Sequence, residues 1–118
     1  MKTLATLLLL TFSATLCHAQ STPEIKQNAY EEYQKSDKAM NTVYQNLMRV
    51  LTEDGKKKLR LSQRAWIAFR DAEADFDCHH FGEGKFGAVE RLGSLKMRTQ
   101  ERTMKLLADY KRFKEING

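Results

Sequence analysis

The densest group of side chains that could do chemistry combines a thiol, two imidazoles and several carboxylates. Cys78, His79 and His80 follow one another directly, and the nearby acids are Asp75, Asp77 and Glu83. These groups are typical transition-metal ligands. Adjacent histidines rarely bind one ion, however, and neither C-x-x-C nor H-x-x-x-H spacing supports them. We therefore expect a polar loop with an accessible thiol, and no metal or other cofactor. A metal-binding envelope protein is kept as an alternative.

Sequence motifs of catalysis are missing. The chain has no Gly-x-Ser-x-Gly, no phosphate-binding Gly-rich turn and no His-Glu-x-x-His. Cys78 beside His79 or His80 resembles a thiolate pair, but side chains so close in sequence seldom have the geometry of a nucleophile and its base. The sequence therefore predicts that the protein is not an enzyme.

The N-terminal residues have the pattern of an export signal. Lys2 precedes an apolar run over 4–16, and Ala19 is a small residue suited to cleavage. This run is shorter than the roughly 20 apolar residues of a membrane span. We expect a signal peptide over 1–19 and a single domain over 20–118. That domain would be periplasmic or secreted and not embedded in a membrane.

Charge and cysteine content narrow the range of partners. The 118 residues carry a net charge of +5, and loss of Lys2 with a signal would leave +4. A modest basic excess usually serves solubility, and an exported protein rarely meets nucleic acid, so we expect no nucleic-acid partner. If Cys17 leaves with the signal, Cys78 has no intramolecular partner, and a Cys78-linked dimer is the remaining cross-link. Lipid attachment at Cys17 is disfavoured because Leu16, just before it, is bulky.

Apolar residues at three- and four-residue spacing predict three helices, over 24–51, 53–76 and 88–114. The segment 77–87 contains three glycines and is the one clear loop. The short connection between the first two helices favours an antiparallel hairpin, along which the third lies back. The predicted fold is all-α, an antiparallel three-helix hairpin or bundle with long first two helices.

The same spacing predicts which residues face inward. They are Tyr30, Tyr33, Asp37, Met40, Tyr44, Leu47 and Leu51 in the first helix; Leu59, Ser62 or Gln63, Trp66, Phe69 and Phe76 in the second; and Val89, Leu92, Leu95, Thr99, Arg102, Leu106, Tyr110 and Phe113 in the third. Gly93 lies inside the third helix. It should weaken this helix by about 1 kcal/mol relative to alanine and would allow close helix approach.

The stretch 63–72, Gln-Arg-Ala-Trp-Ile-Ala-Phe-Arg-Asp-Ala, holds the only tryptophan, Trp66, which we expect at the centre of the three-helix junction. Arg70 and Asp71 are adjacent, so they should point to different parts of the helix surface and need separate partners. Asp37 is expected to pair with Arg70 or Arg102 between helices and so fix their register. A core-stabilising network is the favoured role, and ligand contact is the alternative.

This stretch closely resembles the signature of the lysozyme inhibitor LprI-like family, which comprises small secreted or periplasmic helical domains. Residues 37–44 look like that family's first-helix motif, and 98–102 with Leu106 look like its last-helix motif. Gly82 and Gly84 resemble its glycine pair. The family-motif residues, to which we assign structural roles, are Asp37, Tyr44, Gln63, Trp66, Phe69, Arg70, Asp71 and Arg102.

The chain departs from the family in its cysteines. The family commonly carries one cysteine two residues after the Arg-Asp-Ala and another shortly before the Thr-x-x-Arg. These positions fall near Ala74 and Ser94, and neither is cysteine here. Cys78 matches neither place. The family's cross-link between the second and third helices is therefore absent, at a cost of about 2–5 kcal/mol relative to a bridged relative.

The resemblance implies a non-catalytic binding protein that protects the cell wall by inhibiting lysozyme. Many lysozymes are basic, so attraction would need a local acidic patch, such as Glu31-Glu32 or the group around Glu73. The expected contact is the loop 79–86, which would insert into the lysozyme cleft. Its candidate binding residues are His79, Phe81, Glu83 and Phe86. The alternative function is an interaction module for another envelope or effector protein.

Overall fold

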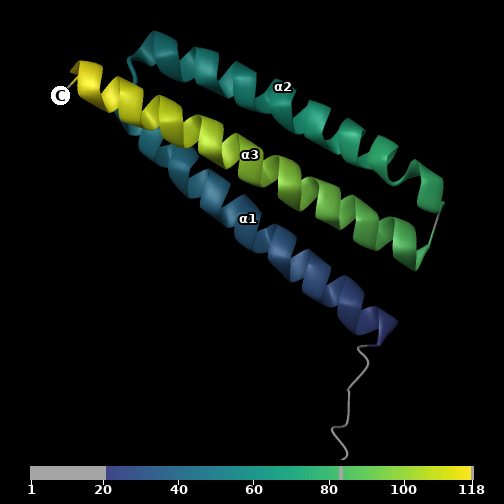
Figure 1. Ribbon diagram of the computed structural model, residues 1–118. Helices are drawn as coiled ribbons and strands as arrows, with labels where there is room; N and C mark the ends of the chain where they lie inside the picture. The colour runs from purple at the N-terminus through teal and green to yellow at the C-terminus, as the bar shows by residue number, and fades with distance from the viewer. Residues whose placement is uncertain (1–20, 83, 118) are drawn as a thin grey trace, which may run out of the picture.

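A computed structural model of the chain describes residues 21–82 and 84–117, so the predicted signal peptide and Glu83 lie outside the described residues. The described part consists of α1 (Thr22–Val50), α2 (Glu53–Asp77), the 3-10 turn η1 (His79–Phe81) and α3 (Lys85–Asn117). It contains no strand, which confirms the all-α prediction (Figure 1). The longest helix is α3, with 33 residues, and not one of the first two as expected.

Local sequence sets the helix boundaries close to the predicted ones. Ser21 is the N-cap of α1, and its backbone N–H donates to the Glu24 carboxylate at 3.4 Å. Thr52 caps α2 by accepting a hydrogen bond from the Gly55 N–H at 3.2 Å. Only two residues, Leu51 and Thr52, separate α1 from α2. So short a connection reverses the chain and makes the two helices antiparallel.

α3 is the helix that holds the other two together. Its backbone packs along both α1 and α2, whereas the backbones of α1 and α2 barely approach each other (Figure 1). α1 and α2 are instead linked by long side chains, which include Gln63 and Arg70 of α2. α2 therefore depends on side-chain contacts for its position relative to α1.

The apolar core lies between α1 and α3. Met40, Leu47 and Leu106 are the buried residues at its centre, each no more than 2% exposed. Trp66 of α2 is half-buried and packs against this cluster from the side. The prediction that Trp66 lies at the centre is therefore corrected. α2 adds an aromatic edge to a core that α1 and α3 build.

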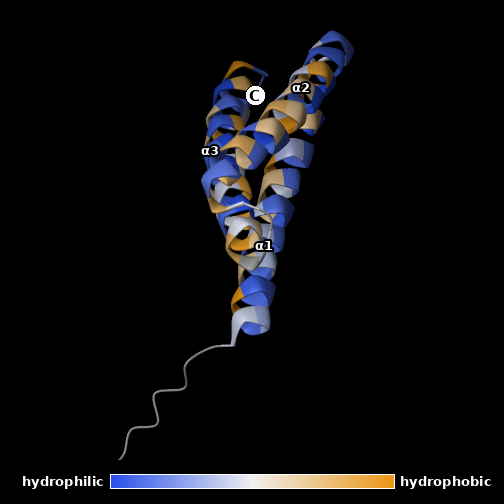
Figure 2. Cartoon of the chain, turned by 90° about the vertical axis from the view of Figure 1, so that its right-hand side faces the viewer, coloured by the Kyte–Doolittle hydropathy of each residue, from blue (hydrophilic) through white to orange (hydrophobic). Residues whose placement is uncertain are grey.

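The predicted inward faces are right for α3 and partly wrong for α1 and α2. Leu95, Thr99 and Leu106 of α3 are buried as expected. Tyr30 of α1 is 44% exposed, however, and on α2 Phe69 and Phe76 are 54% and 69% exposed. The buried residues of α2 are Gln63, Arg70 and Ala74. α2 is thus rotated so that polar side chains face inward, and Figure 2 shows apolar residues spread along all three helices.

The α2–α3 connection is tighter than expected, because α3 begins at Lys85 and not near residue 88. Gly82 and Gly84 have φ angles of +65° and +141°, which favour glycine. Gly87 lies in the first turn of α3, where an added Cβ would approach the Gly82 carbonyl oxygen to 2.2 Å. Gly93 is exposed, with nothing within 4 Å of an added Cβ. The close approach expected at Gly93 is therefore made at Gly87.

Gly87→Ala is expected to destabilise this connection. The methyl group would clash with backbone, which cannot rotate away like a side chain, so we expect a loss of about 1–3 kcal/mol in the free energy of unfolding. Urea denaturation followed by circular dichroism measures this loss. Gly93→Ala is the matched control, because it adds the same methyl group in open space and should stabilise α3 by up to about 1 kcal/mol. Equal effects of the two changes would contradict the packing described for Gly87.

Candidate functional site

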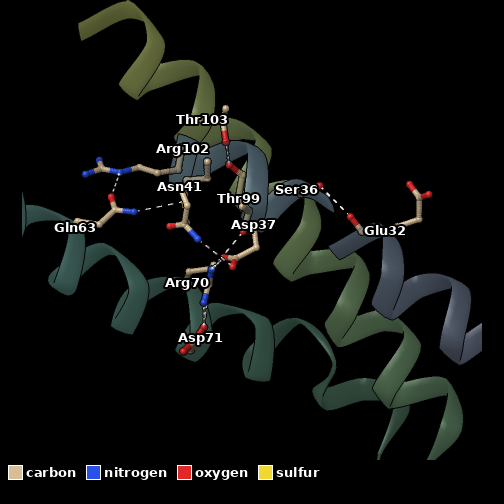
Figure 3. Close-up of polar contacts among 11 residues, drawn as sticks. Glu32, Ser36, Asp37, Asn41, Gln63, Arg70, Asp71, Thr99, Arg102 and Thr103 are labelled. Carbon is tan, nitrogen blue, oxygen red and sulfur yellow. Dashed lines mark hydrogen bonds and ion pairs between the residues drawn. The ribbon is translucent and has the colours of Figure 1, made fainter. Parts of the chain in front are cut away.

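Arg70 is the side chain through which all three helices meet (Figure 3). Only 6% of it is exposed, and its guanidinium lies 3.6 Å from the Asp37 carboxylate of α1 and donates to the Thr99 hydroxyl of α3 at 3.4 Å. The predicted Asp37–Arg70 pair is thus confirmed. Arg70 Nε also donates to the adjacent Asp71 at 3.0 Å. The expectation that Arg70 and Asp71 need separate partners is wrong, because the long arginine side chain folds back onto its neighbour.

Aromatic rings flank the Arg70 guanidinium. Its carbon lies 5.3 Å from the centroid of Trp66 and 5.6 Å from that of Tyr33. A planar cation between ring faces gains electrostatic attraction and covers apolar area. Burial raises the pKa of the Tyr33 phenol, with Arg70 acting in the opposite direction. The arrangement joins α2 to the α1–α3 pair, as a packing network does.

Arg102 forms a second polar contact between α2 and α3, one turn from the Arg70 cluster. Its Nε donates to Gln63 at 3.0 Å and its NH2 group to Ser62 at 3.1 Å. Its guanidinium carbon lies 5.6 Å from the Trp66 centroid. Gln63 in turn donates to the Met40 sulfur at 3.5 Å. The sequence predicted that Asp37 pairs with either Arg70 or Arg102. The structure shows that its partner is Arg70, because Arg102 contacts Gln63 and Ser62 instead.

Two further arginines attach the loop end of α2 to α3. Arg98 lies 3.1 Å from the Glu73 carboxylate and 3.0 Å from that of Asp77, and Arg91 donates to Asp75 at 2.6 Å. The acids of the expected patch around Glu73 are thus neutralised by cations. Glu32, in the other expected patch, likewise faces Lys35 and Lys96. Most acids of the two expected patches are therefore paired with cations of the chain itself, and Glu31 instead accepts from the Gln27 amide at 2.9 Å.

The contacts of Asp77 predict an acid-sensitive α2–α3 junction. The Ser94 hydroxyl donates to Asp77 at 2.5 Å, and this bond, followed by Arg98, holds the pKa of the Asp77 carboxyl below its ordinary value. A lowered folded-state pKa contributes stability above the unfolded-state pKa, and this contribution is lost as the pH falls through the folded-state value. The loss should therefore begin below about pH 4.

Comparison with Asp77→Asn isolates this contribution. The asparagine variant should be less stable than the parent at pH 7 and at pH 5, and the difference should shrink below about pH 4. Urea denaturation at each pH, followed by the fluorescence of the single tryptophan, gives both free energies of unfolding. A difference that stays constant down to pH 2 would contradict the prediction.

The loop residues predicted to bind a partner lie at the α2–α3 end of the molecule. His79 and His80 are exposed, with ring centroids 5.7 Å apart, and Phe81 is 54% exposed. Phe86 is 70% exposed, but it belongs to the first turn of α3 and not to a loop. Glu83 lies outside the described residues. Phe76 was expected to face inward, but it adds a third exposed phenylalanine to this end. We call Phe76, Phe81 and Phe86 the aromatic end.

The thiol and the imidazoles do not assemble into a metal site within residues 21–82 and 84–117. Cys78 is half-buried, and its thiol donates to the Asp75 carbonyl oxygen at 3.3 Å. No group of three histidine, cysteine or acidic side chains in these residues could hold an ion. No helix among them is long and apolar enough to cross a membrane.

The fold and these contacts define a small helical domain whose inward polar residues join the three helices and which has several exposed aromatic side chains at one end. Residues 15–106 match the family model described as lysozyme inhibitor LprI. The match covers well over half of the chain, which therefore belongs to this family of inhibitors. Neither the curated proteins nor the solved structures include a match to the chain.

Proposed function

We propose that this chain is a non-catalytic periplasmic or secreted protein that binds and inhibits lysozyme, and so protects the cell wall. Membership of the lysozyme inhibitor LprI family supports the activity, and the export pattern over residues 1–19 supports the location. We place the binding site at the aromatic end. The observation that supports this placement is that three phenylalanines, each at least half exposed, lie at one end of the domain. Exposed aromatic residues are the common anchors of protein interfaces.

Contacts between α2 and α3 close to the aromatic end support its use as an inhibitory surface. Gly82 and Gly87 close a tight backbone turn behind Phe81, and the contacts of Arg91 with Asp75 and of Arg98 with Asp77 hold the last turn of α2 on α3. A surface already fixed in the free protein loses little conformational entropy on binding. These contacts hold Phe76, on the last turn of α2, next to the start of α3, and so reduce the ordering that binding a partner would require.

The carboxyl groups of a lysozyme cleft are more compatible with the aromatic end than with an acidic surface patch. A lysozyme cleft contains a general-acid carboxyl group and a second carboxylate. His79 and His80 lie beside Phe81 and carry imidazole N–H groups that could donate to such carboxylates. Because the neighbouring acids already face arginines, affinity should come mainly from burial of Phe81 and Phe86. Full burial of each would contribute about 1.5–3 kcal/mol.

Lysis of a peptidoglycan-rich cell suspension by c-type, g-type and i-type lysozymes tests the proposal. The purified mature chain should inhibit at least one type. The triple change Phe81→Ala, Glu83→Ala and Phe86→Ala should weaken that inhibition at least about 100-fold, since two buried phenylalanines account for roughly 3 kcal/mol or more. The variant should keep its helical circular dichroism, because Phe81 and Phe86 are exposed.

Met104→Ala with Ile116→Ala is the matched control. Both residues are exposed to the same extent as the phenylalanines, at 67% and 70%, and lie on α3 away from the aromatic end. This double variant should inhibit like the parent. Inhibition that survives the triple change would remove the aromatic end as the site. A folded parent that inhibits none of the three lysozymes would contradict the proposed function and favour another envelope or effector partner.

A further inference from the structure

The outward face of α2 is apolar, although the inward face of the same helix is polar. A row of exposed apolar residues recurs there at spacings of three and four, and we call it the outer stripe: Leu61, Ala65, Ala68, Phe69, Ala72 and Phe76. The buried side chains of α2 include Gln63 and Arg70. A helix normally turns its apolar stripe toward a packing partner. α1 and α3 both lie on the polar side of α2, so the stripe faces away from them. At its edge Phe69 approaches α3, where the Arg98 guanidinium carbon lies 5.9 Å from the ring centroid.

We propose that the outer stripe binds the outer stripe of a second copy of this chain, in an antiparallel dimer with its two-fold axis near Ala68. The stripe has small residues in its middle and large ones, Leu61 and Phe76, at its ends. Alanines on both helices allow the axes to approach to about 8 Å. In an antiparallel pair, Leu61 of one copy then lies against the Ala72–Phe76 segment of the other. The alanines of the two copies then meet near the axis, and Leu61 and Phe76 pack against each other on either side of it.

Charges along the stripe favour a second copy in this orientation. Arg64, Asp71 and Asp75 follow one another at spacings of seven and four, so they lie on one flank of the stripe. A two-fold axis between antiparallel helices brings this flank against itself with its direction reversed. Arg64 of each copy then faces Asp71 or Asp75 of the other, and symmetry forms the pair twice. In a parallel pair the flank would instead face the side of Ser62, Phe69 and Glu73. Glu73 lies nine residues, or about 14 Å, along the helix from Arg64, and it already faces Arg98 of α3.

The side chains of this flank are free to make these contacts. Arg64 is exposed and forms no ion pair within the described part of the chain. The side chains of Asp71 and Asp75 are 45% and 65% exposed, and each uses Oδ1 for its own arginine, Arg70 or Arg91. The second carboxylate oxygen can therefore accept from a second copy. The charges of this flank are complementary to those of the same flank in a second copy. An unrelated partner would need the same spacing of opposite charges to fit as well.

The dimer proposed here differs from the disulfide-linked dimer that the sequence predicted through Cys78. Cys78 lies ten residues from Ala68, so two Cys78 thiols would be roughly 30 Å apart along antiparallel helices. A disulfide between them is incompatible with the pairing. The same separation places the two aromatic ends at opposite ends of the dimer, where Phe81 and Phe86 remain accessible. The dimer would cover Phe76 of the aromatic end but leave Phe81 and Phe86, the phenylalanines changed in the inhibition test, open to a lysozyme.

Analytical ultracentrifugation of the mature chain under reducing conditions tests the pairing. The parent should sediment as a concentration-dependent dimer. Ala68→Glu should raise the dimer dissociation constant at least about 100-fold, because two charged and larger side chains would replace the alanine contact near the axis and would compete with Asp71 and Asp75 for Arg64. Ala108→Glu, an exposed alanine on α3, is the matched control and should dimerise like the parent. A monomeric parent, or equal effects of the two changes, would overturn the proposal.

Cysteine cross-linking tests the orientation, in a Cys78→Ser background. Ala68→Cys should give a disulfide-linked dimer on mild oxidation, since the two copies of this residue lie near the axis. Leu61→Cys should not, because its two copies would be separated by about 20 Å along the helices. Cross-linking at both positions would show a parallel pair and overturn the antiparallel geometry. Loss of lysozyme inhibition in Ala68→Glu, with a monomeric parent, would assign the stripe to the inhibitor surface instead.

Discussion

Arg70→Ala should destabilise the protein by about 3–5 kcal/mol, the usual cost of removing one partner of a buried charged network. The change leaves the Asp37 carboxylate and the Thr99 hydroxyl without their guanidinium and opens a space between Trp66 and Tyr33. A domain of this size has a total stability of about 5–15 kcal/mol, so the loss is a large share of it. Urea denaturation measures it, with circular dichroism reporting helices and Trp66 fluorescence reporting the α2 contact.

Arg70→Lys is the informative comparison. Lysine keeps the charge near Asp37 but lacks the planar fork that stacks between the two rings and reaches Asp71 and Thr99 at once. We expect a loss of about 1–3 kcal/mol, close to the value of a few charge-assisted hydrogen bonds. Lys58→Ala is a control, because Lys58 forms only an exposed pair with Asp54 and should change little. A loss below about 1 kcal/mol in Arg70→Ala would show that α2 is held by other contacts.

A disulfide between positions 74 and 94 should stabilise the protein by about 2 kcal/mol. Ala74 and Ser94 are both buried, at 0% and 6% exposure, on the facing helices α2 and α3. Closing a loop of this length contributes about 3 kcal/mol through the unfolded state. Loss of the hydrogen bond from Ser94 to Asp77 offsets about 1 kcal/mol of that gain. The double variant Ala74→Cys with Ser94→Cys thus supplies the cross-link that the family commonly has and this chain lacks.

The variant is best made with Cys78→Ser, which leaves one possible pairing. The difference in free energy of unfolding between its oxidised and reduced forms should be about 3 kcal/mol in favour of the oxidised form. The reduced form should be about 1 kcal/mol less stable than Cys78→Ser alone, since it has lost the Ser94 hydroxyl. The prediction would be contradicted if the disulfide did not form under air oxidation and both thiols reacted only after unfolding. Positions 74 and 94 would then not face each other.

Local sequence determined the helices, because helix formation depends on periodic apolar residues, caps and glycine positions. The boundaries of α1 and α2 were predicted within a few residues, and the two-residue link at Leu51 and Thr52 made their antiparallel course necessary. The polar breaks Asp37 and Arg70 in otherwise apolar stripes predicted a pair between helices, and it forms. The motif around Trp66 also identified the family correctly.

The start of α3 and the aromatic end were predicted less well. Three glycines between residues 77 and 87 suggested one open loop, but Gly87 continues the helix because its missing Cβ lets it touch the Gly82 carbonyl. This contact depends on how the chain turns between Gly82 and Gly87, and the spacing of the glycines in the sequence does not reveal that turn. Phe86 consequently projects from a helix and Phe81 from a 3-10 turn. The sequence identified these residues as candidates but could not give their arrangement.

Only the tertiary structure decided which face of α2 turns inward. Its two faces have similar apolar content, with Trp66 on one and Phe69 and Phe76 on the other, so periodicity cannot choose between them. The choice is made by arginines of α3, since Arg98 finds a carboxylate partner, and Arg102 finds amide and ring partners, when the polar face of α2 turns inward. These contacts join residues about 25 to 40 positions apart, and their energy depends on burial, which the sequence does not contain. Apolar periodicity determined that α2 is a helix, whereas long-range polar contacts determined its rotation and left the outer stripe exposed.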